Sequence, residues 1–122
     1  MGNVSTSFEI TSVQQNDNKL LAMVSLNEKN ELFEGHFPNN PIMPGVLNIE
    51  ILEKILDEKL KKQIKQINQI KFLKPVVPNQ NEPLEYKLEV SIKPENRTIV
   101  SVIGTIKDDV FVKIQLEIEP KV

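Results

Sequence analysis

A single helical pattern stands among apolar segments that otherwise suit strands, and it limits the folds open to this chain. From residue 45 to about residue 63 the apolar residues recur at steps of three and four, which predicts an amphipathic helix. They are Val46, Ile49, Leu52, Ile55, Leu56 and Leu60. Together with Ile51 they cover well over half of the helix circumference. A helix with so wide an apolar arc is expected to be buried on several sides.

Six shorter segments flank this helix and predict strands. Their ranges are 8–13, 19–26, 67–73, 84–92, 98–106 and 110–118. A polar run between the first two segments is typical of a hairpin loop, and short turns link the last three into an antiparallel meander. Residues 84–92 and 110–118 alternate between apolar and polar, so one face of each strand is expected to be buried. The predicted order is two strands, one helix and four strands.

Length and composition exclude several classes of protein. The 122 residues, of which 39% are hydrophobic, fit one domain over residues 1–122. A net charge of -2 gives no overall attraction to nucleic acid. The absence of Cys excludes disulfides and thiolate zinc sites, and a single histidine, His36, argues against a histidine-rich metal site. Without a membrane-spanning run or a secretory signal, we expect a cytoplasmic protein.

The residues best suited to chemistry lie just before the predicted helix and in its first turns. His36 lies in a loop stiffened by prolines at positions 38, 41 and 44, and an imidazole is a suitable base near neutral pH. Unpaired N–H groups at a helix start can polarise a carbonyl oxygen, and Gly45 would allow close approach. With the carboxyl group of Glu50 nearby, this combination suits proton transfer next to a carbonyl.

Residues 35–50 resemble the signature of the hotdog-fold 3-hydroxyacyl-acyl carrier protein dehydratases of bacterial fatty-acid synthesis, the FabZ and FabA type. That signature reads Gly-His-Phe-Pro-Gly-x-Pro, two hydrophobic residues, Pro-Gly-Val, three residues and Glu, and this chain matches nearly every fixed position. Residues 72–78 are similar to the segment that follows the central helix in that family. The resemblance implies an α+β hotdog fold, in which a curved antiparallel sheet wraps a long central helix.

Carried over residue by residue, the resemblance makes His36 the catalytic base, Glu50 the acid or water-holding partner, and the Gly45 N–H the donor to the thioester carbonyl. Phe37, Met43, Pro44 and Val46 are the predicted substrate-binding residues, although core packing explains Phe37 and Met43 equally well. In the family, one site takes its His and Glu from different subunits, so a homodimer or a trimer of dimers is implied. The implied partner is acyl carrier protein or coenzyme A, with no metal and no organic cofactor.

Some positions depart from the family pattern. Asn39 replaces a usual Gly, and Asn79-Gln80 replace Gly-Asp. After Glu50 the family shows small residues and a Gln, whereas this chain has Ile51, Glu53 and Lys54. Lys54 follows Glu50 by four residues, a spacing at which a Glu and a Lys pair well on a helix. Such a pair would favour the carboxylate, so Glu50 would hold water or a hydroxyl group by accepting a hydrogen bond.

Three functions remain open. The first is dehydration of a (3R)-3-hydroxyacyl thioester to the trans-2-enoyl thioester, in fatty-acid or polyene-type biosynthesis. The second is hydrolysis of an acyl thioester, with Glu50 activating water. The third is a catalytically silent hotdog subunit that binds acyl carrier or an active homologue, which Glu53 and Lys54 favour. Seven lysines against two acids over residues 54–74 either attract an acidic carrier or only complement the helix dipole and keep the surface soluble.

Overall fold

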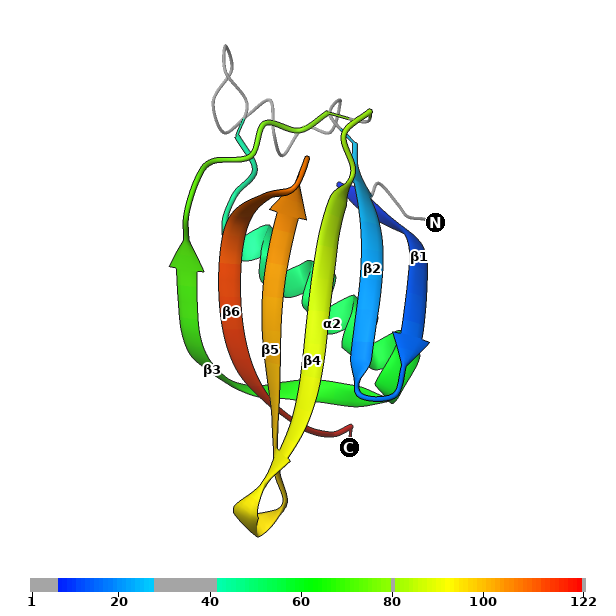
Figure 1. Ribbon diagram of the computed structural model, residues 1–122, viewed down its shortest axis with the longest axis vertical. Helices are drawn as coiled ribbons and strands as arrows, with labels where there is room; N and C mark the ends of the chain where they lie inside the picture. Colours follow the sequence, from blue (N-terminus) through cyan, green and yellow to red (C-terminus); the bar gives the residue numbers. More distant parts are fainter. Residues whose placement is uncertain (1–6, 28–41, 80, 122) are drawn as a thin grey trace.

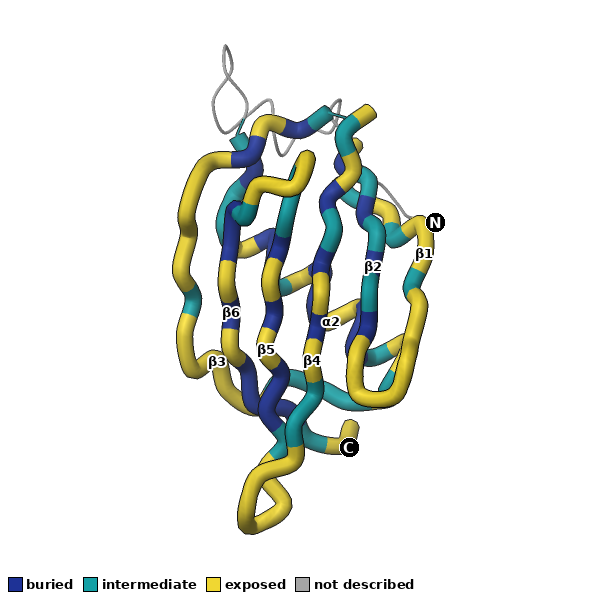
Figure 2. The backbone as a smooth tube through the Cα atoms, viewed as in Figure 1, coloured by how far each residue is buried: buried dark blue, intermediate teal, exposed yellow. Residues whose placement is uncertain are grey.

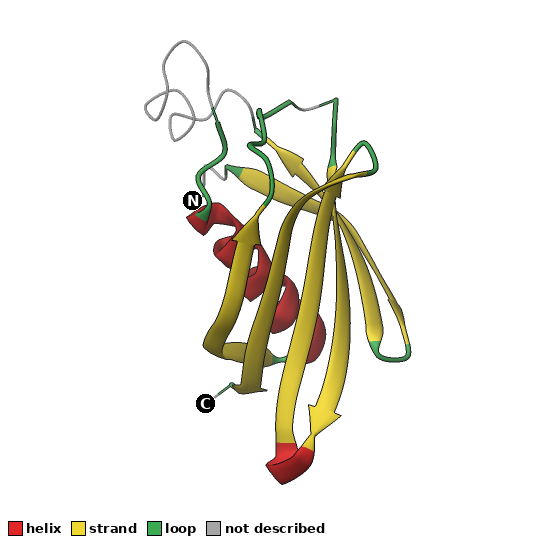
Figure 3. Cartoon of the chain, turned by 60° about the vertical axis from the view of Figure 1, so that its left-hand side comes forward, coloured by secondary structure: helices red, strands yellow, loops and turns green. Residues whose placement is uncertain are grey.

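The computed structural model describes residues 7–27, 42–79 and 81–121. Within these ranges the chain forms two layers, a six-stranded antiparallel sheet and the helix α2 (Val46–Leu60), which lies across the concave face of the sheet (Figures 1 and 3). The strands are β1 (Phe8–Asn16), β2 (Lys19–Leu26), β3 (Lys62–Phe72), β4 (Leu84–Lys93), β5 (Arg97–Ile106) and β6 (Asp109–Pro120). The predicted sheet curved around a central helix is confirmed.

The order of strands in the sheet is β1-β2-β4-β5-β6-β3. β1 pairs with β2 and β4 pairs with β5 through short turns, the second turn being the 3-10 segment η1 (Pro94–Asn96). After β2 the chain passes along α2 and enters the far side of the sheet as β3, which pairs with β6. β1 and β3 are therefore the two edges of the sheet, and the predicted meander of β4, β5 and β6 forms its centre.

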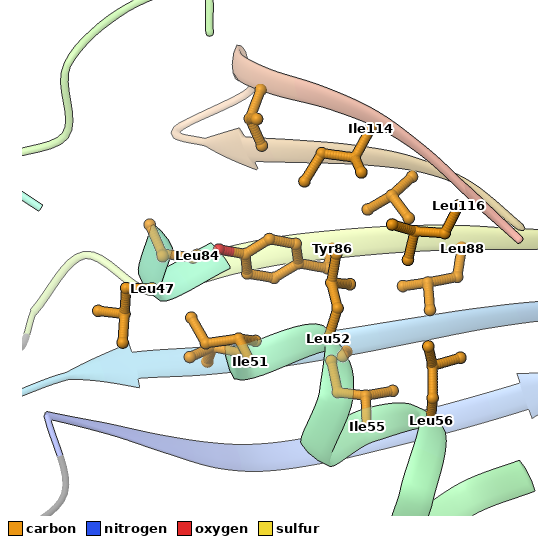
Figure 4. Packing of buried hydrophobic residues seen from close by; sticks show 14 of the residues in the cluster. Leu47, Ile51, Leu52, Ile55, Leu56, Leu84, Tyr86, Leu88, Ile114 and Leu116 are labelled. Carbon is orange, nitrogen blue, oxygen red and sulfur yellow. The ribbon is translucent and has the colours of Figure 1, made fainter. Parts of the chain in front are cut away.

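The core lies between the helix and the concave face of the sheet. Buried and more exposed residues alternate along β2 and along the first half of β4, whereas β3 and β6 interrupt this pattern (Figure 2). Ile51, Leu52, Ile55 and Leu56 of α2 are fully buried against side chains of the sheet, among them Tyr86 and Leu116 (Figure 4). Each such side chain contributes roughly 1.5–3 kcal/mol by leaving water. The outer part of the wide apolar arc is not covered, since Ile49 is half-buried and Val46 is 66% exposed.

The predicted boundary between the helix and the next strand was wrong. The helix ends at Leu60, Lys61 takes a left-handed conformation with φ 57°, and β3 begins at Lys62 rather than at residue 67. The pairing of β3 with β6 shifts register between Ile64 and Gln66 and again between Ile67 and Gln69. Each irregularity adds a residue, so apolar residues follow one another at steps of three in this strand, and the spacing imitates a helix.

No helix in the described ranges is long and apolar enough to cross a membrane.

Candidate functional site

The site is built where the chain enters α2. The N–H of Met43 donates to the carbonyl oxygen of Val76 at 2.8 Å, which fastens residues 42–45 to the segment after β3. Met43 itself is buried, so the side chain anchors this junction in the core. The described part of the first block, residues 42–50, thus lies beside the second block, residues 72–78, at the helix start.

The helix start presents two backbone donors, the N–H groups of Gly45 and Val46. The N–H of Leu47 donates to the Pro44 carbonyl and that of Asn48 donates to the Gly45 carbonyl, both at 3.1 Å. In a trans peptide the N–H points away from the carbonyl, so the N–H groups of Gly45 and Val46 point back out of the helix start. Neither has an acceptor within the described part of the chain. Such donors can bind a carbonyl oxygen that gains negative charge.

Gly45 also leaves room for a neighbouring side chain. A Cβ atom on Gly45 would lie 2.6 Å from Cζ of Phe72, because the ring of Phe72, at the end of β3, lies against this residue. The backbone of Gly45 is in the ordinary right-handed helical region, with φ -58° and ψ -35°. The structural reason for this glycine is therefore the neighbouring ring and not an unusual backbone angle.

A pocket of about 420 Å³ opens beside the helix start. Its lining residues are Met43, Gly45, Asn48, Phe72, Leu73, Lys74, Pro75, Val76 and Phe111. Most of this wall is apolar, so it suits a hydrocarbon chain. At the rim, Lys74 Nζ donates to Asp109 Oδ2 at 2.8 Å, and this hydrogen bond lowers the pKa of the Asp109 carboxyl. Of the four predicted substrate-binding residues, Met43 lines the pocket, whereas Pro44 and Val46 lie beside it at the helix start.

Phe111 reaches this pocket through an irregularity in β6 that the sequence did not indicate. Alternation along residues 110–118 placed Phe111 on the outer face, yet it is buried. The pairing of β5 with β6 shifts register after Gly104, which opposes Val112, and both Phe111 and Val112 turn inward. A Cβ on Gly104 would lie 2.7 Å from Val112 Cγ1 and 2.9 Å from Phe111 Cζ, so the glycine leaves room for both side chains.

Asn48 and Tyr86 form a buried hydrogen-bonded pair, which the sequence pattern also missed. The Tyr86 hydroxyl donates to Asn48 Oδ1 at 2.6 Å, and Asn48 Nδ2 donates to the Gly45 carbonyl at 3.1 Å. Burial raises the pKa of the Tyr86 hydroxyl, so it remains a neutral donor at physiological pH. The alternation along residues 84–92 predicts the burial of the Tyr86 ring, which is correct, but indicates no partner for its hydroxyl group.

Glu50 lies on the exposed side of α2. The ion pair expected between Glu50 and Lys54 is absent among the described residues, because Lys54 Nζ instead lies 5.9 Å from the centre of the Phe8 ring. Glu53, which the helical pattern put close to the apolar arc, is exposed. His36 and Phe37 lie outside the described residues.

The lysines between residues 54 and 74 do not form one uninterrupted basic surface. Lys65 Nζ lies 3.6 Å from Glu117 Oε2, and Lys74 is paired with Asp109, both acids of β6. These pairs offset part of the local positive charge that the sequence predicts. In residues 7–27, 42–79 and 81–121, no three His, Cys, Asp or Glu side chains are grouped so that they could hold a metal ion.

Comparison with known proteins identifies the family. The ApeI-like family model, described as ApeI dehydratase, matches residues 12–115. The chain is 31% identical over 112 residues to a 3-hydroxyacyl-[acyl-carrier-protein] dehydratase FabZ of Petrotoga mobilis, covering 85% of this chain and 79% of that one. It is 32% identical over 96 residues to the FabZ of Koribacter versatilis, covering 70% of this chain and 59% of the relative.

A solved structure has the same fold. The dehydratase heterocomplex ApeI:P from Xenorhabdus doucetiae superposes with a TM-score of 0.72 at 18% identity, over 90% of this chain and 96% of that one. The helix with its curved sheet is the arrangement expected of a hotdog fold, and the family model spans most of it. The chain therefore belongs to the ApeI-like family of hotdog dehydratases.

Proposed function

We propose that this chain removes water from a (3R)-3-hydroxyacyl thioester to give the trans-2-enoyl thioester. One observation carries the proposal: two backbone N–H groups without an acceptor in the described chain lie beside an apolar pocket, on the helix that also bears Glu50. A thioester carbonyl needs such donors when a proton leaves its α-carbon, because negative charge then develops on the oxygen.

In the proposed reaction His36 takes the α-proton through its imidazole, and the electron pair of the broken C–H bond moves toward the carbonyl. The Gly45 N–H donates to the oxygen that becomes enolate-like. As the double bond forms between the α- and β-carbons, the bond from the β-carbon to the hydroxyl breaks. Glu50 supplies a proton to the departing hydroxyl, which leaves as water. Lys54 is directed toward Phe8 and not toward Glu50.

The acyl chain is proposed to enter the pocket at the helix start. Met43, Phe72, Val76 and Phe111 offer it an apolar wall. Phe37, Pro44 and Val46 complete the proposed substrate-binding set. Because FabZ relatives are named for acyl-carrier-protein substrates, we propose that the acyl group arrives on a carrier protein or on coenzyme A, in fatty-acid or polyene-type biosynthesis.

We further propose that residues 1–122 form one domain and that the active form is a homodimer or a trimer of dimers. Three features support an assembly. Glu50 is exposed in the single chain, Val46, Phe72, Leu73 and Val77 leave apolar surface in water near the helix start, and β3 is an edge of the sheet. The family resemblance implies that the partner subunit's histidine would meet Glu50 across such an interface.

A second candidate function is that of a silent subunit paired with an active homologue. The similar solved structure is named as a dehydratase heterocomplex, so this fold does occur in mixed assemblies. The uncovered Glu50 and helix start would suit a homologous partner as well as a second copy.

The test is a mass-spectrometric assay of the purified chain with 3-hydroxyacyl and 2-enoyl thioesters on carrier protein and on coenzyme A. Reversible gain and loss of one water is expected, and His36→Ala should lower the rate by about 10²- to 10⁴-fold. Lys54→Gln is the matched control, because Lys54 contacts Phe8 and not Glu50, and it should leave the rate unchanged.

Each other outcome has a definite meaning. Release of free thiol, with no interconversion of the 3-hydroxyacyl and 2-enoyl thioesters, would identify a thioesterase. No conversion together with saturable carrier binding would favour the silent subunit. Full activity of the His36→Ala variant would refute the mechanism.

A further inference from the structure

Asn48 is a polar side chain on the buried face of α2. It is only 3% exposed, and the apolar residues Ile51, Leu52 and Ile55 occupy the same face in the next turns. A buried carboxamide is costly unless its oxygen and nitrogen find hydrogen-bonding partners. The hydrogen-bonding partners of Asn48 therefore indicate its role.

Both ends of the Asn48 side chain are engaged. Oδ1 accepts from the Tyr86 hydroxyl at 2.6 Å, and Nδ2 donates to the Gly45 carbonyl at 3.1 Å. The backbone N–H of Asn48 donates to the same carbonyl, also at 3.1 Å. One residue therefore holds the Gly45 carbonyl through two donors, and Tyr86 holds that residue in turn.

Tyr86 is a rigid support for this arrangement. Its side chain is fully buried, and its ring meets the ring of Phe111 edge to face, with centroids 5.9 Å apart and planes at 83°. Figure 4 shows the hydroxyl group directed toward the start of α2. Because the ring cannot shift without disturbing the core, the position of the hydroxyl oxygen is fixed, and with it the orientation of the Asn48 carboxamide.

The Gly45 carbonyl belongs to the same planar peptide as the Val46 N–H. When the carbonyl is fixed toward Asn48, the N–H is fixed in the opposite direction, out of the helix start and next to the Gly45 N–H. We propose that Asn48 and Tyr86 are positioning residues of the dehydration. They hold the Gly45–Val46 peptide so that its N–H joins the Gly45 N–H in binding the developing oxyanion. This inference rests on the proposed function.

Stability alone does not require the pair. Replacing both partners of a buried hydrogen bond by apolar groups of similar shape can be nearly neutral, whereas removing one partner leaves the other unsatisfied and is costly. This difference separates a structural role from a positioning role. In Asn48→Leu and in Tyr86→Phe one group loses its partner, and in the double variant neither group remains.

The experiment is a double-mutant cycle that measures kcat, KM and the urea midpoint of unfolding. Asn48→Leu should lower kcat about ten- to a hundredfold, because the Val46 N–H is misplaced. KM should stay within about twofold of the wild-type value, because the apolar pocket remains. Tyr86→Phe should lower kcat less, since Nδ2 can still reach the Gly45 carbonyl. The double variant should recover most of the urea midpoint but keep the low kcat of Asn48→Leu. A double variant with wild-type kcat would overturn the inference.

Two further measurements keep the outcome unambiguous. Ile55→Val, a core change away from the helix start, should lower the urea midpoint without changing kcat. In ¹H–¹⁵N spectra, Asn48→Leu should shift the Gly45 and Val46 amide signals more than those of the last helical turn, and unchanged signals would refute the positioning role. If the wild-type chain converts no thioester, the proposed function fails, and the amide signals still decide whether Asn48 orients this peptide.

Discussion

At the helix start, Gly45 lies against the aromatic ring of Phe72. Gly45 has no side chain, and the ring of Phe72 fills the volume that a Cβ would need. The sequence suggested another reason for the glycine, namely close approach of substrate to the backbone. The two explanations differ in what should happen when the ring is removed, because only the packing explanation involves Phe72.

Gly45→Ala should push the Phe72 ring toward the pocket that both residues line. Because the Phe72 side chain is more than half exposed and can turn, we expect a loss of stability of only about 1 kcal/mol. The value of kcat/KM should fall far more than this loss explains. Thermal unfolding and steady-state kinetics of the variant measure the two effects separately.

A second substitution distinguishes the explanations. In Gly45→Ala/Phe72→Ala the ring no longer competes with the new methyl group, so kcat/KM should rise above that of the single Gly45→Ala variant. Phe72→Ala alone is the control for loss of the pocket wall. No recovery in the double variant would show that the substrate itself needs the space above Gly45.

Among the secondary-structure elements, β6 carries an acidic side chain, Glu117, that pairs with one basic side chain on each neighbouring strand. Glu117 is buried, and its carboxylate accepts from Arg97 of β5 at 3.2 Å and lies 3.6 Å from Lys65 of β3. The hydrogen bond from Arg97 lowers the pKa of Glu117, burial opposes this effect, and the charges of Arg97 and Lys65 add to the lowering. The ionised carboxylate thus stabilises the folded state, in which it has both partners.

This cluster predicts a pH dependence of stability. A pKa lowered on folding stabilises the protein fully above the ordinary value of 4.5, and the contribution is lost as the pH falls through the folded-state pKa. The free energy of unfolding of the wild type should therefore fall below about pH 4.5. Glu117→Gln should be less stable at pH 7 and lose less stability over the acidic range. Urea titrations at several values from about pH 3 to about pH 7 measure the free energy of unfolding of both proteins. Equal slopes of this free energy against pH would contradict the assignment.

How far each element could be predicted depended on whether its strand pairing is regular. Residues 84–92 pair with β5 without a shift, and their alternation predicted the strand and the burial of Leu84, Tyr86 and Leu88 correctly. At the far end of the strand the prediction was wrong, since Ile92 is 79% exposed. In β3 the two register shifts place Ile64, Ile67 and Ile70 three residues apart, so period-two alternation could not reveal the start of the strand. The burial of Phe111 was missed for the same reason, because the shift after Gly104 becomes visible only when β5 and β6 are paired.

The candidate site was predictable in part. The block over residues 35–50 indicated the helix start and its backbone donors, and Gly45 and Met43 do line the pocket. Asn48 and Tyr86 are 38 positions apart, and only the packing of α2 on β4 brings them together. No local pattern distinguishes such a residue from an ordinary polar position on a helix.

For the whole molecule, the proposed assembly determines how the sites are composed. If each site takes His36 from one subunit and Glu50 from the other, mixed dimers of His36→Ala and Glu50→Gln chains contain one intact site and one doubly defective site. Refolding equal amounts of the two inactive variants together should restore about one quarter of wild-type activity. The measurement is the dehydration rate before and after mixing, with analytical ultracentrifugation to establish the oligomeric state.

Each variant refolded alone is the control and should remain inactive. No recovery in a mixture that demonstrably forms dimers would mean that both groups act within one chain. A strictly monomeric wild type would refute the shared site directly.

The position of β3 in the sheet has a consequence for synthesis of the chain. β3 lies between α2 and β4 in the sequence, but its sheet neighbour is β6, the last of the described strands. Most buried residues that face the helix lie on β4, β5 and β6. At the usual speed of translation, the roughly 60 residues from the end of the helix to the end of β6 take about 3 to 12 s to emerge. During that interval only β1 and β2 are available to cover α2, so we expect the nascent chain to bind chaperones that recognise apolar segments.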